Sequence, residues 1–313
     1  MKFAVVGTGG VGGFFGGKLA KSGEEVWFLA RGKHLDAMRA AGLRVRSTEA
    51  DYVLPPGRMT DSAAQAGPVD VVLFCVKSYD TESAARSLDP LLKDESIIIS
   101  LQNGIDNEEK IQREIRRGAV YGGVANIYST ITAPGEITET GGPRKIIFGP
   151  LGHSAPDGRG RSILDVMQRA GINATLSDNI HIDLWEKYIF ITAVAGITAL
   201  TRLTLGEILA VPATKSLLAD AMKETLAVAH ANGVRVTPGF IDNVFTALQR
   251  FPNNSRSSLY HDLVYDRPLE IEALSGGVIK LGKEPGIPTP IHQTIYASLL
   301  PYHLKNTNQR ISD

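Results

Sequence analysis

Residues 2–12 read KFAVVGTGGVG, an apolar run followed by a glycine-rich segment in which Gly7, Gly9 and Gly12 have the spacing G-x-G-x-x-G. A short strand followed by glycines at this spacing, and then by a helix, is typical of a dinucleotide-binding loop. The first glycine permits a tight turn, the second lets the backbone approach a pyrophosphate, and the third packs the helix on the strand. The helix N-terminus offers N–H groups to the anion. A glycine-rich turn without a ligand is the alternative. We predict a dinucleotide site formed by Gly7, Thr8, Gly9, Gly10, Val11 and Gly12.

Beyond this loop, the first half of the chain alternates short β-branched runs with helical stretches. The runs EEVWFLAR (24–31), VDVVLFCVK (69–77) and SIIISLQ (96–102) read as strands separated by helices. This alternation predicts βαβ units and a parallel sheet. The glycine- and threonine-rich segments YGGVANIYST, GEITET and RKIIFG should extend the sheet. A further helix from Ser162 to Ala170 and a short strand, INATLS, are expected after them.

After residue 178 strand signals almost vanish and helical stretches follow one another. We predict helices over 180–200, 213–231, 239–249, 269–281 and 291–304. The expected fold class is therefore α/β: an N-terminal Rossmann-type doubly wound sheet, residues 1–178, followed by an all-helical C-terminal domain, residues 179–313.

The composition is that of an ordinary globular protein. The 313 residues are 43% hydrophobic, which is enough for about two domains with packed cores. Lys plus Arg and Asp plus Glu balance at 33 each, so charge gives no reason to expect nucleic acid or a membrane as a partner. We expect a small-molecule partner, and the composition leaves assembly into a homo-oligomer open.

Cysteine usage and the lack of targeting signals favour the cytoplasm. Cys75 lies in an apolar run and has no mate, so we interpret it as a core residue in a reducing compartment. The first residues enter a strand without the pattern of a secretory signal. The most apolar window, 188–200, is shorter than the ~20 residues that a membrane span needs. The adjacent His261 and Asp262 have no metal-ligand spacing around them, and we predict no metal site.

The second predicted strand ends in Ala30 and Arg31 instead of an acid. An NAD-selective site normally places Asp or Glu there, ~20 residues past the glycines, to hold the ribose hydroxyls. Arg31, followed by Lys33 and His34, offers positive charge where a 2′-phosphate would lie. We predict NADP as the cofactor, and a solvated loop arginine is the alternative.

Two more polar residues follow predicted strands at the edge where doubly wound sheets bind ligands. Lys77 ends LFCVK, and Asn103 lies in SLQNGID. Each alone reads as a turn or loop residue, since Asn-Gly is a natural turn dipeptide. Beyond a dinucleotide loop, however, both positions face the nicotinamide end of the crevice, where a polar residue can meet cofactor or substrate.

Lys187 stands on the apolar side of the predicted helix DLWEKYIFITAVAGITAL (183–200). Ile180, Leu184, Ile191 and Val194 follow one another at steps of three or four, and Lys187 lies in the same row. An inward ammonium must find partners or lose its charge. The alternative is a lysine whose stem covers apolar surface while its head reaches solvent.

The motifs recur in order along both halves of the chain: the glycine loop, Arg31, VK (76–77), QNG (102–104), LWEK (184–187), SSLYHDL (257–263) and EIEALSG (270–276). Together they resemble the ketopantoate reductase (2-dehydropantoate 2-reductase) family over most of the chain. The resemblance implies a Rossmann domain joined to a helical domain, with NADPH reducing ketopantoate to pantoate in the cleft between them. That reaction belongs to cytoplasmic pantothenate and coenzyme A synthesis.

The resemblance also implies roles for single residues. Lys187 matches the proton donor, Asn103 a residue touching cofactor and substrate, and Lys77 one lining the cofactor site. Ser258 matches a substrate-binding residue, and Glu270 a catalytic acid that lies near the nicotinamide ribose and the lysine. Read from the residues alone, Ser258 could belong to a polar loop, and Glu270 could stabilise a helix dipole.

Ile191 and Ala195 depart from the family pattern. One and two turns past Lys187, the family usually presents asparagines that contact the substrate, whereas this chain has aliphatic residues. The substrate therefore stays open, and a sister NADPH-dependent reductase of another branched 2-oxo acid is the alternative. A non-catalytic NADP sensor is a further one, against which the retention of Lys187 and Glu270 argues.

Overall fold

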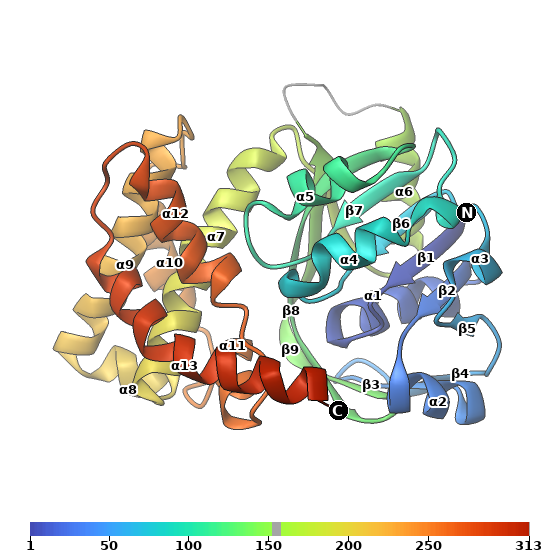
Figure 1. The fold of residues 1–313 in the computed structure, drawn as a ribbon, viewed down its shortest axis with the longest axis horizontal. Coiled ribbons are helices and arrows are strands. Elements are labelled where there is room, and N and C mark those ends of the chain that lie inside the picture. The colour runs from blue at the N-terminus through green and yellow to red at the C-terminus, as the bar shows by residue number, and fades with distance from the viewer. Residues whose placement is uncertain (152–157, 313) are drawn as a thin grey trace. The chain divides into compact units, whose positions relative to one another are not determined.

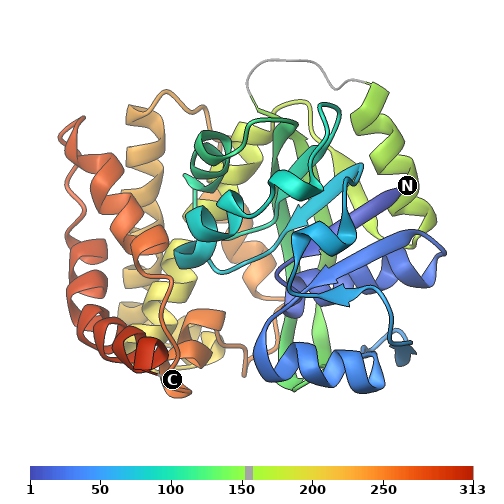
Figure 2. The same cartoon turned by 45° about the vertical axis from the view of Figure 1, so that its right-hand side comes forward.

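The computed structural model describes residues 1–151 and 158–312, which divide into two compact units. Unit 1 comprises residues 1–102 and 106–183, and unit 2 comprises residues 103–105 and 184–313. Figure 1 and Figure 2 show unit 1 as a sheet with helices and unit 2 as helices. The predicted fold class, a parallel α/β sheet followed by a helical part, is confirmed.

The sheet of unit 1 has the order β4-β3-β9-β8-β7-β6-β1-β2-β5, with β10 also paired to β9. β1 pairs in parallel with β2 on one side and with β6 on the other, and β6 pairs in parallel with β7. The strand bounds are β1 Lys2–Val6, β2 Glu25–Leu29, β3 Leu43–Arg46, β4 Tyr52–Leu54, β5 Met59–Thr60, β6 Val71–Phe74, β7 Ile97–Ser100, β8 Ala119–Ala133, β9 Glu136–Pro150 and β10 Asn173–Leu176.

Both faces of the sheet are buried at its central strands β1, β6 and β7, as their continuous apolar runs require. Phe3 and Val5 of β1 join one core, packed by α1 and α6, while Ala4 and Val6 join the core on the other face, packed by α4 and α5. The helices are α1 Gly10–Lys21, α2 Gly32–Ala41, α3 Ala63–Ala66, α4 Thr81–Arg86, α5 Asn107–Glu114 and α6 Gly158–Arg169, with 3₁₀ turns at Ser78–Asp80 and Asp89–Leu91.

The glycine- and threonine-rich segments form one long antiparallel hairpin, β8–β9, instead of separate short strands. GEITET and RKIIFG both belong to β9, whose first part pairs with β3 and whose last part pairs with β10. Arg144, with a φ of 48°, lies between these two parts. The hairpin reaches the glycine loop, because a Cβ built on Gly10 would lie 2.2 Å from the carbonyl oxygen of Ser129 in β8.

Unit 2 packs its helices around one apolar core. They are α7 Ile180–Thr201, whose first turn belongs to unit 1, α8 Leu205–Ala210, α9 Pro212–Ala231, α10 Phe240–Leu248, α11 Ser258–Val264, α12 Gly277–Lys283 and α13 Pro290–Ser312, with a π-helical turn at Glu272–Gly276. The expected helix over 269–281 is therefore a π-helical turn followed by α12. The short α8 was not predicted, although Thr204 and Glu207 form a capping box at its start.

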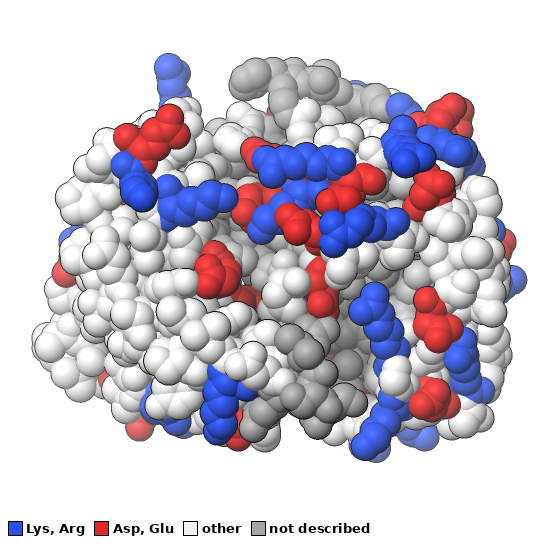
Figure 3. Space-filling model, viewed as in Figure 1, with Lys and Arg blue, Asp and Glu red and all other residues white. Residues whose placement is uncertain are grey.

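Charged side chains of both signs lie side by side on the surface. On the face in Figure 3, Lys and Arg side chains are interspersed with Asp and Glu side chains. Ion pairs such as Arg86 with Glu114 (3.1 Å) and Lys110 with Asp106 (2.9 Å) show the same mixing. Within residues 1–151 and 158–312, no helix is long and apolar enough to cross a membrane.

Candidate active site

The parallel pairing of β2, β1, β6 and β7 brings the carboxyl ends of these strands to one edge of the sheet. The strand order reverses at β1, whose neighbours are β2 on one side and β6 on the other. Ligands of open α/β sheets bind at such a switch point. The glycine loop follows β1, Arg31 follows β2 and Lys77 follows β6, so these sequence-predicted residues share that edge.

The three glycines of the loop each meet a different steric demand. Gly7 has a φ of 95°, and a Cβ there would lie 2.7 Å from the backbone nitrogen of Val76. A Cβ on Gly12 would lie 2.4 Å from the carbonyl oxygen of Gly7, whereas one on Gly9 would meet no atom within 4 Å. Gly7 therefore makes the tight turn and Gly12 the tight packing, whereas the backbone at Gly9 is open. This geometry suits the approach of a pyrophosphate to Gly9.

Thr8 and Gly10 anchor the loop to the rest of unit 1. The Thr8 hydroxyl and the Thr8 backbone N–H both donate to the carbonyl oxygen of Leu29, at 3.0 and 3.1 Å. The Thr8 side chain is thus occupied inside the protein. Gly10 begins α1 and packs against Ser129, while Val11 is half-buried. The first N–H groups of α1 have no acceptor within the helix and point toward the loop.

The positive charge after β2 comes from two residues, not three. Arg31 and Lys33 are exposed, with Arg31 at the N-cap of α2. His34 is half-buried and its Nδ1 accepts a hydrogen bond from the backbone N–H of Gly135 at 3.0 Å. Burial lowers the pKa of His34 below its ordinary value, although the Thr8 backbone opposes the shift. His34 is therefore neutral at pH 7, and the expectation that it adds charge there is wrong.

Gln102 is a residue that the sequence interpretation missed, although it begins the QNG motif. It is buried, and its side-chain amide donates to the Val76 carbonyl at 3.0 Å and to the Thr81 hydroxyl at 2.8 Å. Val76 precedes Lys77 and Gln102 precedes Asn103, so this amide ties together the two chain segments that carry these residues. Lys77 and Asn103 are both half-buried.

Lys187 lies on α7 and is half-buried. The next residue, Tyr188, is 1% exposed, and its hydroxyl donates to the Leu274 carbonyl at 2.7 Å, inside the π-helical turn. A Cβ on Gly277 would lie 2.3 Å from that hydroxyl, so a glycine is needed where Tyr188 docks. The turn of α7 that carries Lys187 is thereby fastened to the segment that begins at Glu270.

Glu270 is 5% exposed and lies just before the π-helical turn instead of in the first turn of a helix. Its carbonyl accepts from Leu274 N–H at 3.1 Å, and the wider π-type bond runs from Gly276 N–H to the Ile271 carbonyl at 2.8 Å. π-helical turns of this kind are frequent at functional sites. A buried carboxylate at such a turn is a candidate for chemistry.

Ser258 and its neighbour Ser257 have different surroundings. Ser258 is exposed at the first position of α11, whereas Ser257 is buried at the N-cap. The Ser257 hydroxyl accepts from the Tyr260 N–H at 3.1 Å and lies 2.7 Å from the Thr198 hydroxyl. Ser257 therefore fixes α11 to α7, and Ser258 is the serine that faces solvent.

The two aliphatic replacements on α7 also differ. Ile191 is partly exposed, but Ala195 has no exposed surface and belongs to the core of unit 2. Of the aliphatic wall expected from these two residues, only Ile191 can therefore meet a substrate. Thr192 and Thr198 are fully buried, and their hydroxyls bond the carbonyls of Tyr188 and Val194.

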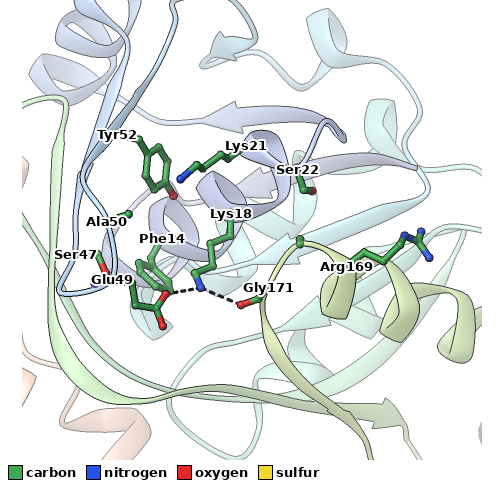
Figure 4. Close-up of a pocket in the computed structure, with 11 residues that line it drawn as sticks. Phe14, Lys18, Lys21, Ser22, Ser47, Glu49, Ala50, Tyr52, Arg169 and Gly171 are labelled. Atoms are coloured by element: carbon green, nitrogen blue, oxygen red, sulfur yellow. Dashed lines mark hydrogen bonds and ion pairs between the residues drawn. The ribbon is translucent and has the colours of Figure 1, made fainter.

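A separate pocket of about 340 Å³ lies at the other end of α1, lined in part by Phe14, Lys18, Lys21, Tyr52, Arg169 and Gly171 (Figure 4). Lys18 Nζ is bonded to Glu49 at 2.6 Å and to the Gly171 carbonyl at 2.9 Å, and Arg169 points away from the lysines. None of the predicted site residues lines it. Within residues 1–151 and 158–312, no three His, Cys, Asp or Glu side chains gather as a metal site.

Family models and relatives match both halves of the chain. The family described as "Ketopantoate reductase PanE/ApbA" matches residues 3–153, and its "C terminal" counterpart matches residues 179–303. The uncharacterized oxidoreductase YkpB of Bacillus subtilis is 31% identical over 96% of this chain and 99% of that protein. A 2-dehydropantoate 2-reductase of Halobacterium salinarum is 30% identical over 94% of this chain and 96% of that protein.

A solved structure shows the same likeness in three dimensions. The 2-dehydropantoate 2-reductase from Geobacter metallireducens GS-15 is 29% identical, with a TM-score of 0.89 over 96% of this chain and 99% of that one. The motifs, the fold and the two matching family models together cover both units. The chain belongs to the ketopantoate reductase family of oxidoreductases.

Proposed function

We propose that this protein reduces ketopantoate to pantoate with NADPH, using Lys187 as the proton donor. The observation that carries the proposal is the half-buried Lys187 on a turn of α7 whose next residue, Tyr188, is bonded to the segment behind Glu270. A lysine that merely covered apolar surface would not need its helix turn fastened beside a buried carboxylate.

The edge of unit 1 supports NADPH as the cofactor. The open backbone at Gly9 and the N-terminus of α1 suit a pyrophosphate, and the exposed Arg31 and Lys33 favour a 2′-phosphate. Lys77 and Asn103 would line the nicotinamide end. When bound, NADPH supplies a hydride to the keto carbon C2 of the substrate.

Lys187 would handle the charge that this reduction creates. Addition of hydride at C2 moves the carbonyl π electrons onto oxygen, where the ammonium stabilises the negative charge and donates a proton. The products are the alcohol and a neutral amine, which regains its proton from solvent. Glu270 would favour the charged form of Lys187, and Ser258 would bind the substrate. The proposal requires the nicotinamide and Lys187 to reach the same substrate.

An NADPH-oxidation assay over a panel of 2-oxo acids, ketopantoate included, tests this function. Lys187→Ala should lower kcat by ~10²-fold or more and leave NADPH affinity intact, as loss of a general acid does. The control is Lys223→Ala, which removes an exposed lysine paired with Asp220. Failure to reduce any 2-oxo acid would refute the reductase. Near-normal turnover of Lys187→Ala would make Lys187 a packing residue.

A reductase of another branched 2-oxo acid is the second candidate, because Ile191 offers an aliphatic contact one turn past Lys187. Comparing kcat/KM for ketopantoate and 2-oxoisovalerate, which lacks the hydroxymethyl group, separates the two. A preference for ketopantoate above ~10⁴ would show that a polar group reads the hydroxyl. Comparable values would favour the second candidate.

Ketopantoate reduction would place the protein in cytoplasmic pantothenate and coenzyme A synthesis, where a single cysteine in the sequence suits a reducing compartment. A non-catalytic NADP sensor would bind the cofactor without turnover. Such a sensor has no use for the Lys187 and Glu270 arrangement, and the same assay distinguishes it.

A further inference from the structure

A buried chain of side-chain hydrogen bonds passes through His292, outside the residues assigned to the reaction. His292, Thr192 and Thr225 have no exposed surface, and Ser275 is 2% exposed. His292 Nδ1 lies 3.2 Å from the Ser275 hydroxyl, and Nε2 lies 2.9 Å from the Thr225 hydroxyl. Thr225 and Thr192 hydroxyls are 3.2 Å apart. The chain thus joins the π-helical turn, α13, α9 and α7.

The direction of these hydrogen bonds follows from one carbonyl. Nε2 of His292 lies 3.0 Å from the Ala221 carbonyl oxygen, which can only accept, so Nε2 carries the ring proton. Burial lowers the pKa of His292 to about 4, so the ring is neutral at pH 7 and Nδ1 accepts from Ser275. Thr192 donates to the Tyr188 carbonyl at 2.8 Å, so its oxygen is the acceptor toward Thr225. The Thr225 hydroxyl accepts from His292 Nε2, and its one proton is shared between Thr192 and the Ala221 carbonyl, which lies 3.3 Å away.

Two further contacts close and anchor this arrangement. Tyr188, whose carbonyl ends the chain, donates its hydroxyl to Leu274 in the π-helical turn where the chain begins. The carboxylate of Glu224 accepts from the backbone N–H groups of Ile291 and His292, at 2.9 and 3.1 Å, and so holds His292 at the start of α13. Burial, chiefly, raises the pKa of Glu224. These two contacts hold both ends of the hydrogen-bond chain in place.

We propose that His292 is a positioning residue for the reduction: through Ser275, Thr225 and Thr192 it holds the π-helical turn behind Glu270 in register with the turn of α7 that carries Lys187. Only the rate measurement that tests this proposal rests on the proposed function. A displacement of ~1 Å between a catalytic group and its target can lower the rate by ~10²-fold. Keeping the two elements in a fixed register therefore protects the rate, which outweighs the cost of burying polar side chains.

Single hydroxyl deletions test the proposal without removing the histidine. Thr192→Val and Ser275→Ala each break one link, and Thr192→Ser keeps the hydroxyl. The matched control is Thr201→Val, on the same helix as Thr192. The Thr201 hydroxyl donates to the Ile197 carbonyl at 2.7 Å and takes no part in the buried hydrogen-bond chain. The readouts are kcat at saturating NADPH and ketopantoate, corrected for folded fraction, and amide hydrogen exchange over residues 270–277.

We expect Thr192→Val and Ser275→Ala to lower kcat by ~10-fold or more, with Thr192→Ser and Thr201→Val within ~2-fold of wild type. Exchange at Leu274 and Gly276 should accelerate in the two deletions and not in the control. Unchanged kcat and exchange, or equal losses in Thr201→Val, would overturn the proposal. If the wild type reduces no 2-oxo acid, the proposed function fails, and the exchange comparison alone decides the positioning role.

Discussion

Basic residues that lie close together in the sequence differ in exposure and charge because their surroundings differ. Arg31 and His34 lie three positions apart, yet Arg31 is exposed at the N-cap of α2 while His34 is bonded to Gly135 and neutral. His292, which is fully buried, likewise accepts a hydrogen bond at Nδ1, from Ser275, and protonation of that nitrogen would break the bond. Charge at these positions therefore depends on burial and partners, not on residue type.

Arg31→Glu should weaken NADPH binding much more than NADH binding. A charge-assisted hydrogen bond is worth ~1.5–3 kcal/mol, so we expect a loss of at least ~10-fold for NADPH and little change for NADH. Titration of both cofactors by fluorescence measures the ratio. Arg161→Glu, an exposed site on α6, controls for net charge. Equal weakening of both cofactors would mean that Arg31 only shapes the start of α2.

The stability of unit 2 should fall as the pH drops from about 6.5 to about 4. His292 titrates near 6.5 when unfolded and near 4 when folded. The unfolded chain therefore binds the proton first, and about 3 kcal/mol of stability present above pH 6.5 is lost on acidification. Glu224, with a raised pKa, opposes this trend.

Urea unfolding at several pH values in a Trp27→Phe background measures this loss, since Trp185 then reports on unit 2. His292→Gln removes the titrating ring and leaves Glu224, so the difference between the two proteins isolates the histidine. We expect a flatter pH dependence in His292→Gln. Parallel curves for the two proteins would show that His292 titrates near its ordinary pKa.

At the scale of elements, the joints between helices and strands carry the candidate site. The loop between β1 and α1 contains a Gly9 with open space beside it and a Gly10 pressed against β8. The π-helical turn accepts the Tyr188 hydroxyl and leads into α12 at Gly277. These joints hold conformations that regular helix or strand backbone could not supply.

Gly9→Ala should therefore weaken cofactor binding, whereas Gly10→Ala should lower stability. A methyl group at Gly10 would lie 2.2 Å from the Ser129 carbonyl oxygen, so we expect overpacking to cost ~1–3 kcal/mol of stability. A methyl group at Gly9 meets no protein atom, so stability should be unchanged while NADPH binding weakens. Thermal unfolding and cofactor titration of both variants separate these effects. Weakened stability in Gly9→Ala with normal binding would contradict the assignment of the loop.

At the scale of the whole molecule, the two compact units divide the proposed work. The glycine loop, Arg31 and Lys77 belong to unit 1, while Asn103, Lys187, Ser258 and Glu270 belong to unit 2. Charges balance along the chain, so cofactor binding relies on local groups such as Arg31 and not on a field of the whole protein.

NADPH should therefore slow amide hydrogen exchange most in the segments 7–12 and 31–34, because binding stabilises the state that holds the ligand. Helices α8 and α10 should exchange at unchanged rates. NADH at the same saturation should protect the loop 7–12 and leave 31–34 less protected, since it has no 2′-phosphate. Uniform protection of both units by either cofactor would argue against a site built from these segments.

The central strands, the helical second half and the glycine loop could be predicted from the sequence, because they depend on local periodicity or on backbone freedom at Gly7, Gly9 and Gly12. The short strands β3, β4 and β5 and the long β8–β9 hairpin were not predicted. The placement of Lys187 on an apolar helix row was also readable. Only the tertiary structure showed that Ala195 is buried, that His34 is neutral, and that Gln102 joins two strand ends. These properties arise from partners distant in the chain, such as Gly135, Val76 and Thr81, which no local pattern encodes.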